Sequence, residues 1–153
     1  MGIVFEATTQ ADAEALVEIR ILAMRESLQR ISRFDPQRAR DRFLAAFEPA
    51  LCRYIVANGT KAGFVLVRPM VDHLLLDHLY VKPDHQGRGI GLAALRTVMA
   101  EADAKSMPIR LGALRGSDSN RFYQRHGFVQ TDESEWDIYY VRDPQTVSDV
   151  SPP

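Results

Sequence analysis

The sequence predicts a mixed α+β domain in which a mostly antiparallel sheet is flanked by about four helices. Three extended segments in the middle of the chain are separated only by short turns, which indicates an antiparallel meander. A glycine-rich loop and a helical pattern then lead to a further strand, which indicates one β-α-β crossover. The 153 residues are 46% hydrophobic and 25% charged, which is typical of one globular domain.

The first third of the chain is predicted to form one strand and two helices. Residues 3–8 have the pattern of a strand, and Thr9 can cap the helix that follows. A second helix begins at Asp35-Pro36, a capping residue followed by proline at the first helical position, and ends at Pro49. Apolar residues at helical spacing form the expected buried faces, with Val17, Ile21, Met24, Leu28 and Ile31 in the first helix and Ala39, Phe43 and Phe47 in the second.

The middle of the chain contains the predicted meander, with strands over 51–57, 61–68 and 73–81. Asn58-Gly59 joins the first two strands and is a strong hairpin signal, because both residues tolerate positive φ. Pro83 ends the third strand, and a helix is expected over 90–103. Its inward face is predicted to contain Leu92, Leu95, Met99 and Ala102.

The last third is predicted to contain a strand over 109–114, a short helix over 117–126 and a final strand over 136–142. Gly127 ends the short helix as a left-handed residue and is followed by apolar Phe128. The predicted order is therefore β-α-α-β-β-β-α-β-α-β, in a single domain over 1–142. Residues 143–153 are rich in Pro, Ser and Asp, and we expect a flexible C-terminal tail there.

Composition and charge exclude several classes of function. The formal net charge is -1, so no general attraction to nucleic acid is expected. No apolar run approaches the roughly 20 residues of a membrane span, and the N-terminus lacks the features of a signal peptide. The chain has one cysteine, Cys52, so no internal disulfide can form, and a cytoplasmic location is expected.

The most informative segment is Gln86-Gly87-Arg88-Gly89-Ile90-Gly91, between a predicted strand and a predicted helix. The start of a helix offers unpaired N–H groups and a partial positive charge, both of which attract phosphate oxygens. The three glycines allow positive φ and a close approach of the backbone to a ligand. Arg88 adds a cation that can bind phosphate through two hydrogen bonds.

Other phosphate-binding motifs do not fit this loop. A P-loop requires Lys followed by Ser or Thr after its second conserved glycine, whereas Leu92 follows Gly91 here. A dinucleotide fingerprint requires Gly or Ala at position 92 within an early parallel βαβ unit, which the preceding hairpins contradict. A tight strand-to-helix turn without a ligand is the remaining alternative for the loop taken by itself.

Two motifs make the chain resemble the GNAT superfamily of N-acetyltransferases. Gln86, Gly89 and Gly91 match the family's phosphate loop, Gln/Arg-x-x-Gly-x-Gly/Ala, and the run 79–85 looks like the end of its fourth strand. The run 117–128 resembles the family's fourth helix, in which a tyrosine, here Tyr123, lies four residues before a Gly-Phe pair. The resemblance covers about residues 3–142. Ser117 and Ser119 stand where the family often has Asn and Ala.

The resemblance implies a twisted sheet whose fourth and fifth strands splay apart around acetyl-CoA as co-substrate. The pantetheine arm would pair with backbone groups of Leu79 and Val81. The diphosphate would rest on backbone N–H groups of the loop. The cofactor-binding residues implied in this way are Leu79, Tyr80, Val81, Gln86, Gly87, Arg88, Gly89, Ile90, Gly91, Ser119, Asn120 and Phe122.

The chemistry requires a neutral amine, a donor for the oxyanion and a proton for the leaving thiolate. Tyr123 is the candidate acid, because a phenol with a pKa of about 10 can protonate a forming thiolate, and its position matches the family's acid. A core tyrosine is the alternative. The resemblance implies the Leu79 N–H as the oxyanion donor.

The general base is less clearly marked. Asp77 alternates with Leu79 and Val81 on one strand and could accept the proton directly or through water. The alternative is a solvent-facing residue or one that pairs with an arginine. Cys52 lacks an activating base nearby in the sequence, so we expect direct transfer in a ternary complex rather than an acyl-cysteine. No close cluster of His, Cys and carboxylates is present, so no metal site is predicted.

The acceptor is expected to be a primary amine of a small molecule or peptide. An arginine-rich run could hold an anionic group of the acceptor, although a solvated face is the simpler reading. Trp136 and Ile138 are predicted to lie in the core or at a dimer edge. The alternative is that they form an aromatic wall for the acceptor. Whether the protein forms a homodimer is left open by the sequence. A non-catalytic acetyl-CoA sensor on the same fold is the competing function. The arginines of the run are Arg30, Arg33, Arg38, Arg40 and Arg42.

Overall fold

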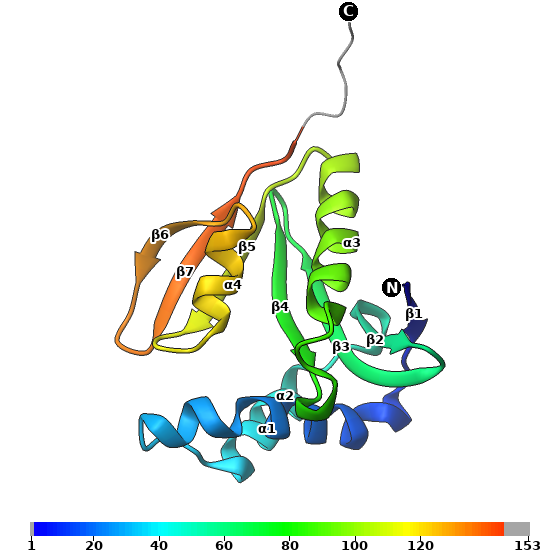
Figure 1. Ribbon diagram of the computed structural model, residues 1–153, viewed down its shortest axis with the longest axis vertical. Helices are drawn as coiled ribbons and strands as arrows, with labels where there is room; N and C mark the ends of the chain where they lie inside the picture. Colours follow the sequence, from blue (N-terminus) through cyan, green and yellow to red (C-terminus); the bar gives the residue numbers. More distant parts are fainter. Residues whose placement is uncertain (1, 146–153) are drawn as a thin grey trace, which may run out of the picture. The chain divides into compact units, whose positions relative to one another are not determined.

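The computed structural model describes residues 2–145 of the chain (Figure 1). Its seven strands form one sheet in the order β1-β2-β3-β4-β5-β7-β6. The contacts divide the described chain into two compact units, one made of residues 2–67 and 78–94 and the other of residues 68–77 and 95–145. Strands β3 (Thr60–Pro69) and β4 (Leu74–Val81) and helix α3 (Ile90–Ala104) contribute residues to both units.

The first unit contains the predicted hairpin. Strands β1 (Ile3–Ala7) and β2 (Cys52–Ala57) pair antiparallel, with Ile3 opposite Ala57, and β2 pairs antiparallel with β3. Asn58 and Gly59 form the turn with φ values of 52° and 76°. This confirms the hairpin, since both residue types tolerate positive φ.

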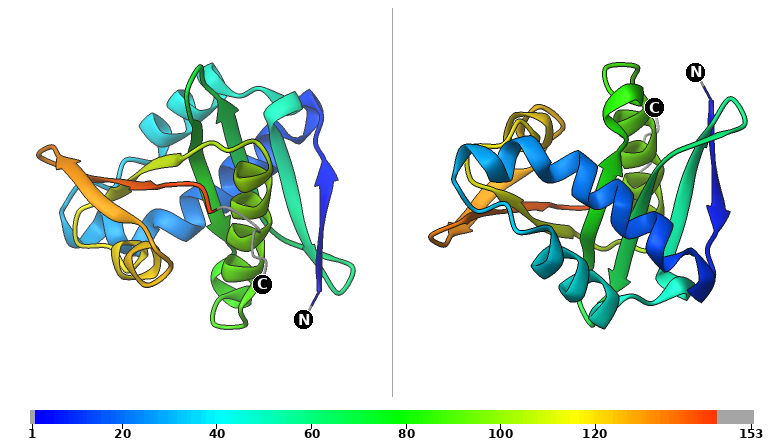
Figure 2. Two further views of the ribbon diagram at one scale, coloured as in Figure 1. Left: turned by 90° about the horizontal axis from the view of Figure 1, so that it is seen from above. Right: turned by 90° about the horizontal axis from the view of Figure 1, so that it is seen from below.

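Two helices belong to the same unit, α1 (Ala13–Arg30) and α2 (Pro36–Ala46), and they lie side by side (Figure 2). The predicted caps are present. The Asp35 carboxylate accepts a hydrogen bond from the Arg38 N–H at 3.1 Å. Thr9 caps a short 3-10 turn, Gln10–Asp12, that precedes α1. The chain therefore enters both helices through local side-chain to backbone bonds, as the sequence predicted.

The buried face of α1 lies nearer its N-terminus than the predicted stripe. Val17 is buried as expected, whereas Met24 and Leu28 are only half-buried. The buried residues of α1 join a core cluster with Phe43, which stacks on Phe47 at 5.5 Å between ring centroids. The first two turns of α1 thus supply most of its packing, with Ala13, Leu16, Val17 and Ile19 as the buried residues.

The second unit is built around strand β5 (Ile109–Leu114). The start of β4 pairs with β5 in parallel, with Leu74 opposite Ile109, which confirms the predicted crossover. Strand β7 (Asp137–Arg142) pairs antiparallel with β5, and β6 (Val129–Glu133) forms a hairpin with β7 (Figure 1). The short helix α4 (Ser119–Arg125) lies between β5 and β6 in the chain.

Strand β6 was not predicted from the sequence, and the prediction of six strands was wrong. All five residues of β6 are exposed, so the strand lacks the alternation of apolar and polar residues that marks a half-buried strand. The prediction of a helix from 117 was also early by two residues.

The predicted tail falls largely outside the described residues, which end at 145. Of residues 143–153, the structure describes 143–145, and the Gln145 N–H donates to the Asp103 carboxylate at 2.9 Å. No helix within residues 2–145 has the length and apolarity that crossing a membrane requires.

Candidate active site

The glycine-rich loop adopts the backbone conformation that its sequence predicts. Gly87 and Gly89 have φ values of 79° and 78°, in the left-handed region that favours glycine. A Cβ atom built on either residue would meet no atom within 4 Å. The Gln86 side chain donates to the Val81 carbonyl oxygen at 2.9 Å and so ties the loop to the end of β4. The loop is therefore held at its base and has open space above its backbone.

Helix α3 begins directly after this loop. Its first intrahelical hydrogen bond runs from the Ala93 N–H to the Gly89 carbonyl at 3.0 Å. The N–H groups of Ile90, Gly91 and Leu92 precede that bond and have no acceptor within the helix. The Ile90 side chain is 2% exposed and packs in a core cluster with Ile55. Ile90 is therefore an anchor for the helix start, and any ligand contact there would come from its backbone.

The end of β4 is fixed by packing within the first unit. Leu79 and Val81 lie against the apolar cluster that contains Ile90. Tyr80 packs on Phe64 at 5.6 Å between centroids, and its hydroxyl lies 3.3 Å from the Met24 sulfur.

His78 contacts Phe43 and Phe64, with centroid distances of 5.3 and 6.0 Å. The side chains of His78 and Tyr80 thus pack within the first unit, and a contact of Tyr80 with the cofactor stays a prediction.

Tyr123 lies in the second unit, on α4, and is 7% exposed. Its ring meets Phe122 at 5.2 Å and Phe128 at 5.4 Å between centroids, both edge-on. These contacts restrict the ring to one orientation and leave the role of its hydroxyl as a prediction. The backbone supports the motif, since the Phe128 N–H donates to the Tyr123 carbonyl at 3.0 Å.

Asn120 has its side chain fully engaged within the second unit. Its amide nitrogen donates to the carbonyl oxygens of Leu114 and Ser117 at 2.9 and 3.0 Å, and its amide oxygen accepts from the Tyr140 hydroxyl at 2.8 Å. Ser119 shares a 2.7 Å hydrogen bond with the Ser117 hydroxyl. Asn120 thus fastens α4 to the neighbouring strands, and its backbone N–H also donates to the Ser117 carbonyl at 3.2 Å, so its donors are engaged within the chain.

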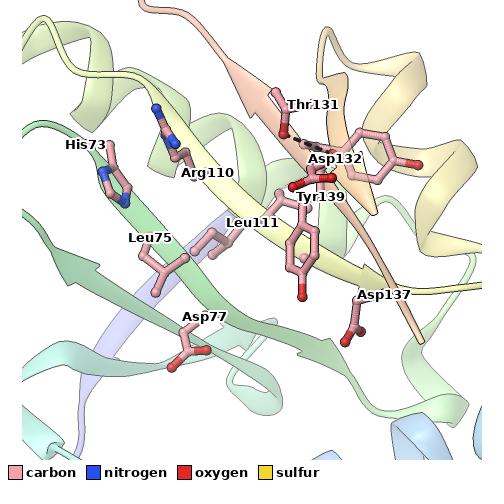
Figure 3. A pocket seen from close by; sticks show the side chains of 12 residues that line it. His73, Leu75, Asp77, Arg110, Leu111, Thr131, Asp132, Asp137 and Tyr139 are labelled. Carbon is pink, nitrogen blue, oxygen red and sulfur yellow. Dashed lines mark hydrogen bonds between the residues drawn. The ribbon is translucent and has the colours of Figure 1, made fainter. Parts of the chain in front are cut away.

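Asp77 accepts a hydrogen bond from the Arg68 Nε at 2.7 Å. The alternative of pairing with an arginine, which the sequence left open, is therefore observed. Asp77 also lines a pocket of about 640 Å³ in the second unit (Figure 3). The role of Asp77 as the general base stays a prediction.

The same pocket contains residues that the sequence analysis did not assign to a site. They come from β5 to β7 and include Arg110, Gly112, Asp132 and Asp137. Tyr139 on β7 also lines the pocket and is 38% exposed (Figure 3). The pocket was not predicted because β6 was not predicted. The pairing of β6 with β7 is what places Asp132 beside Tyr139.

Residues 50–130, more than half of the chain, match the family model described as an acetyltransferase (GNAT) domain. The chain belongs to the GNAT acetyltransferase family. Domains of this family use acetyl-CoA as the acyl donor, and the matched segment contains both the glycine-rich loop and Tyr123. The resemblance drawn from the two motifs is thereby confirmed.

Solved structures share the GNAT fold at low sequence identity. A PaiA N-acetyltransferase from Thermoplasma acidophilum, in complex with coenzyme A, is 19% identical, with a TM-score of 0.72 over 94% of this chain and 99% of that chain. A ribosomal-protein-alanine N-acetyltransferase from Escherichia coli is 17% identical, with a TM-score of 0.71 over 96% and 97%. A GCN5-related N-acetyltransferase from Rhodopseudomonas palustris is 18% identical, with a TM-score of 0.77 over 94% and 96%.

These likenesses confirm the predicted mixed fold of the GNAT type and do not identify the acceptor. A search of curated protein sequences finds no significant match.

Cys52 has the properties of a structural thiol in this GNAT domain. Its side chain is 1% exposed, and burial raises the pKa of the thiol to about 12. Because the thiolate is the nucleophilic form, a buried thiol of this kind is inert near neutral pH.

Two arginines of the predicted run form ion pairs with glutamates of the first unit. Arg40 contacts Glu14, and Arg30 lies 3.6 Å from Glu26. These pairs agree with a solvated helix face, and an anion-binding role for the run stays a prediction. Within residues 2–145, no group of three His, Cys, Asp or Glu side chains is arranged to hold a metal ion.

Proposed function

We propose that this GNAT domain transfers the acetyl group of acetyl-CoA to a primary amine of a small molecule or a peptide. The observation that carries the proposal is the glycine-rich loop at the start of α3. Gly87 and Gly89 expose backbone in the left-handed region with no Cβ, next to N–H groups that precede the first helical hydrogen bond. Oriented N–H groups at a helix start are suited to bind a diphosphate.

The residues present fit this co-substrate. In our proposal, the N–H groups from Gln86 to Gly91 hold the diphosphate, and the exposed Arg88 side chain adds a positive charge. Backbone groups of Leu79 and Val81 pair with the pantetheine arm, and Ser119, Asn120 and Phe122 on α4 are proposed as further contacts. Because the side-chain amide and the backbone N–H of Asn120 are both occupied internally, its contribution would come through the position of α4.

Three groups of the chain are proposed to carry the reaction. Asp77 accepts the proton of the attacking amine, directly or through water. The Leu79 N–H donates to the oxyanion, and Tyr123 donates a proton to the leaving thiolate.

We further propose direct attack of the amine on the thioester, in a ternary complex. The buried Cys52, with its raised pKa, supports this route over an acyl-cysteine.

Two measurements test the proposed function in sequence. Calorimetric titration with coenzyme A should show binding at one site per chain. A panel of primary amines with acetyl-CoA should then release free thiol only in the presence of an acceptor. Absence of coenzyme A binding would contradict the proposal at its base. Binding without turnover on any small or peptide amine would instead favour a non-catalytic acetyl-CoA sensor.

A further inference from the structure

The pocket of the second unit lies on the exposed face of β5 and β7. Residues of β5 alternate strictly, so that Ile109, Leu111 and Ala113 are buried and the residues between them are exposed. Gly112 stands opposite Tyr139 in the antiparallel register. A Cβ atom at Gly112 would lie 3.1 Å from the Tyr139 ring, so the ring rests directly on the glycine backbone. The absence of a side chain at 112 therefore gives the pocket an aromatic wall.

The charged groups on one side of the pocket partly offset one another. Arg68 pairs with Asp77 at 2.7 Å. Arg110 adds one positive charge to the lining, and this charge makes a small contribution to the lowered pKa of Asp72, after the larger effect of the hydrogen bond between Asp72 and His73.

Two further carboxylates of the lining flank the aromatic ring, and that of Asp132 accepts a hydrogen bond from the Glu133 N–H at 2.8 Å. Asp132 lies opposite Tyr139 in the β6–β7 register, and Asp137 precedes Tyr139 by two residues on the same face of β7 (Figure 3). Within residues 2–145, no hydrogen bond or ion pair engages the Asp137 carboxylate. The Tyr139 ring is thus the centre of a region with excess negative charge.

We propose that this pocket is the acceptor site and that it selects amines carrying a second cationic group. The inference rests on the proposed function. The reacting amine lies toward Asp77, and the second cation lies against the Tyr139 ring between Asp132 and Asp137. A cation over a tyrosine face is stabilised by the ring quadrupole, and two carboxylates add Coulomb attraction. An acceptor with an anion at that position would instead meet like charge.

Three probes of equal chain length isolate the charge at the far end: 1,5-diaminopentane, pentylamine and 5-aminopentanoate. Each is titrated calorimetrically into the protein loaded with coenzyme A, and each is assayed with acetyl-CoA for thiol release. We expect the diamine to bind most tightly and 5-aminopentanoate most weakly. The difference should shrink as salt is added, because exposed charges are screened.

Variants of the lining test whether the preference comes from this pocket. Asp132→Asn combined with Asp137→Asn should weaken diamine binding by about tenfold and remove the order among the probes. Tyr139→Leu should weaken it by about threefold. The control is Glu135→Gln combined with Asp143→Asn, two exposed residues outside the lining that change the net charge equally. This control should leave the order intact.

Equal affinity for the three probes, no detectable binding of the diamine, or an order that survives in the Asp132/Asp137 double variant would each overturn the inference. These outcomes are separable from failure of the proposed function. If coenzyme A binds and other amines release thiol while the probes are not distinguished in this way, only the inference about the pocket fails.

Discussion

Neighbouring side chains fix the position of the Tyr123 ring, which carries the hydroxyl proposed as the acid. Phe122 and Phe128 hold the ring at 5.2 and 5.4 Å, so Tyr123→Phe should preserve the packing. We expect the variant to bind coenzyme A normally and to lose about a hundredfold or more in kcat, because a general acid is removed. Steady-state kinetics beside calorimetry measures both quantities. Tyr54→Phe, which removes a hydroxyl bonded to Asp12 in the first unit, is the control and should keep kcat. Undiminished turnover in Tyr123→Phe would remove Tyr123 from the mechanism.

Gly89→Ala tests the loop through backbone conformation alone. Space for the added methyl is present, but φ is 78°, and an L-residue there costs roughly 1–2 kcal/mol. We expect coenzyme A to bind about tenfold more weakly, because the loop relaxes away from the binding conformation. Gly59→Ala is a matched control, with φ of 76° and equal open space, in the hairpin of the first unit. If both substitutions changed the affinity equally, the effect would be one of general stability.

Individual residues were predictable where the backbone decides their role. The positive φ of Gly87 and Gly89 follows from the residue type and the position before a helix, and the structure has it. The ion pair of Asp77 was not predictable in the same way. Arg68 lies nine residues earlier, across a turn whose register the sequence does not define. The roles of the predicted site residues in catalysis stay predictions.

At the scale of elements, α4 depends on one side chain. Asn120 bonds the Leu114 carbonyl and the Tyr140 hydroxyl, and Tyr140 is 2% exposed. Asn120→Ala leaves these groups without a partner, and we expect a loss of about 2–3 kcal/mol in the free energy of unfolding. Urea denaturation measures it, with Gln124→Ala as the control on the exposed side of the helix. Alanine has the highest helix propensity, so neither substitution should destabilise the protein through propensity. A loss as large in Gln124→Ala would show that the hydrogen bonds of Asn120 are not responsible.

The C-terminal hairpin contains one strand that the sequence predicted, β7, and one that it did not, β6. Strand β7 alternates buried Ile138, Tyr140 and Arg142 with more exposed residues and was found. Strand β6 lies at the edge of the sheet and has no buried residue, so its sequence contains no pattern that predicts its pairing with β7. The pocket around Tyr139 was missed for the same reason, because Asp132 in its lining comes from that edge strand.

At the scale of the molecule, stability should depend on pH through Asp103. Arg142 donates two hydrogen bonds to its carboxylate, at 3.0 and 3.1 Å, and the pKa of Asp103 is lowered mainly by this contact. A carboxyl whose pKa is lower in the folded state stabilises it above the unfolded pKa, near 3.9, and less as the pH falls through the folded value. We therefore expect Tm to fall as the pH is lowered below about 4.

Asp103→Asn is the variant that isolates this contribution. Arg142 is 7% exposed, so removal of its counter-charge should cost about 2–3 kcal/mol at neutral pH and flatten the acid limb of the Tm profile. Asp143→Asn, an exposed neighbour, should change neither. The proposal would be wrong if the profile of Asp103→Asn followed the wild type through the acid range.

The molecule as a whole was largely predictable, since the meander, the single crossover and the loop between them define the GNAT fold and the matched family. The buried contacts and ion pairs within each unit could not be predicted, because they join residues that are far apart in the chain. The Asp103–Arg142 pair spans 39 positions and has no local signature.

Because Cys52 is buried, the protein is expected to be unreactive toward disulfide reagents near neutral pH. It is the only cysteine of the chain, it is 1% exposed, and its thiol stays protonated well above physiological pH. A colorimetric disulfide reagent can therefore follow coenzyme A release continuously without a background from the enzyme. For the same reason, a cysteine introduced at Val71, which is 99% exposed, would carry a fluorophore at one defined position.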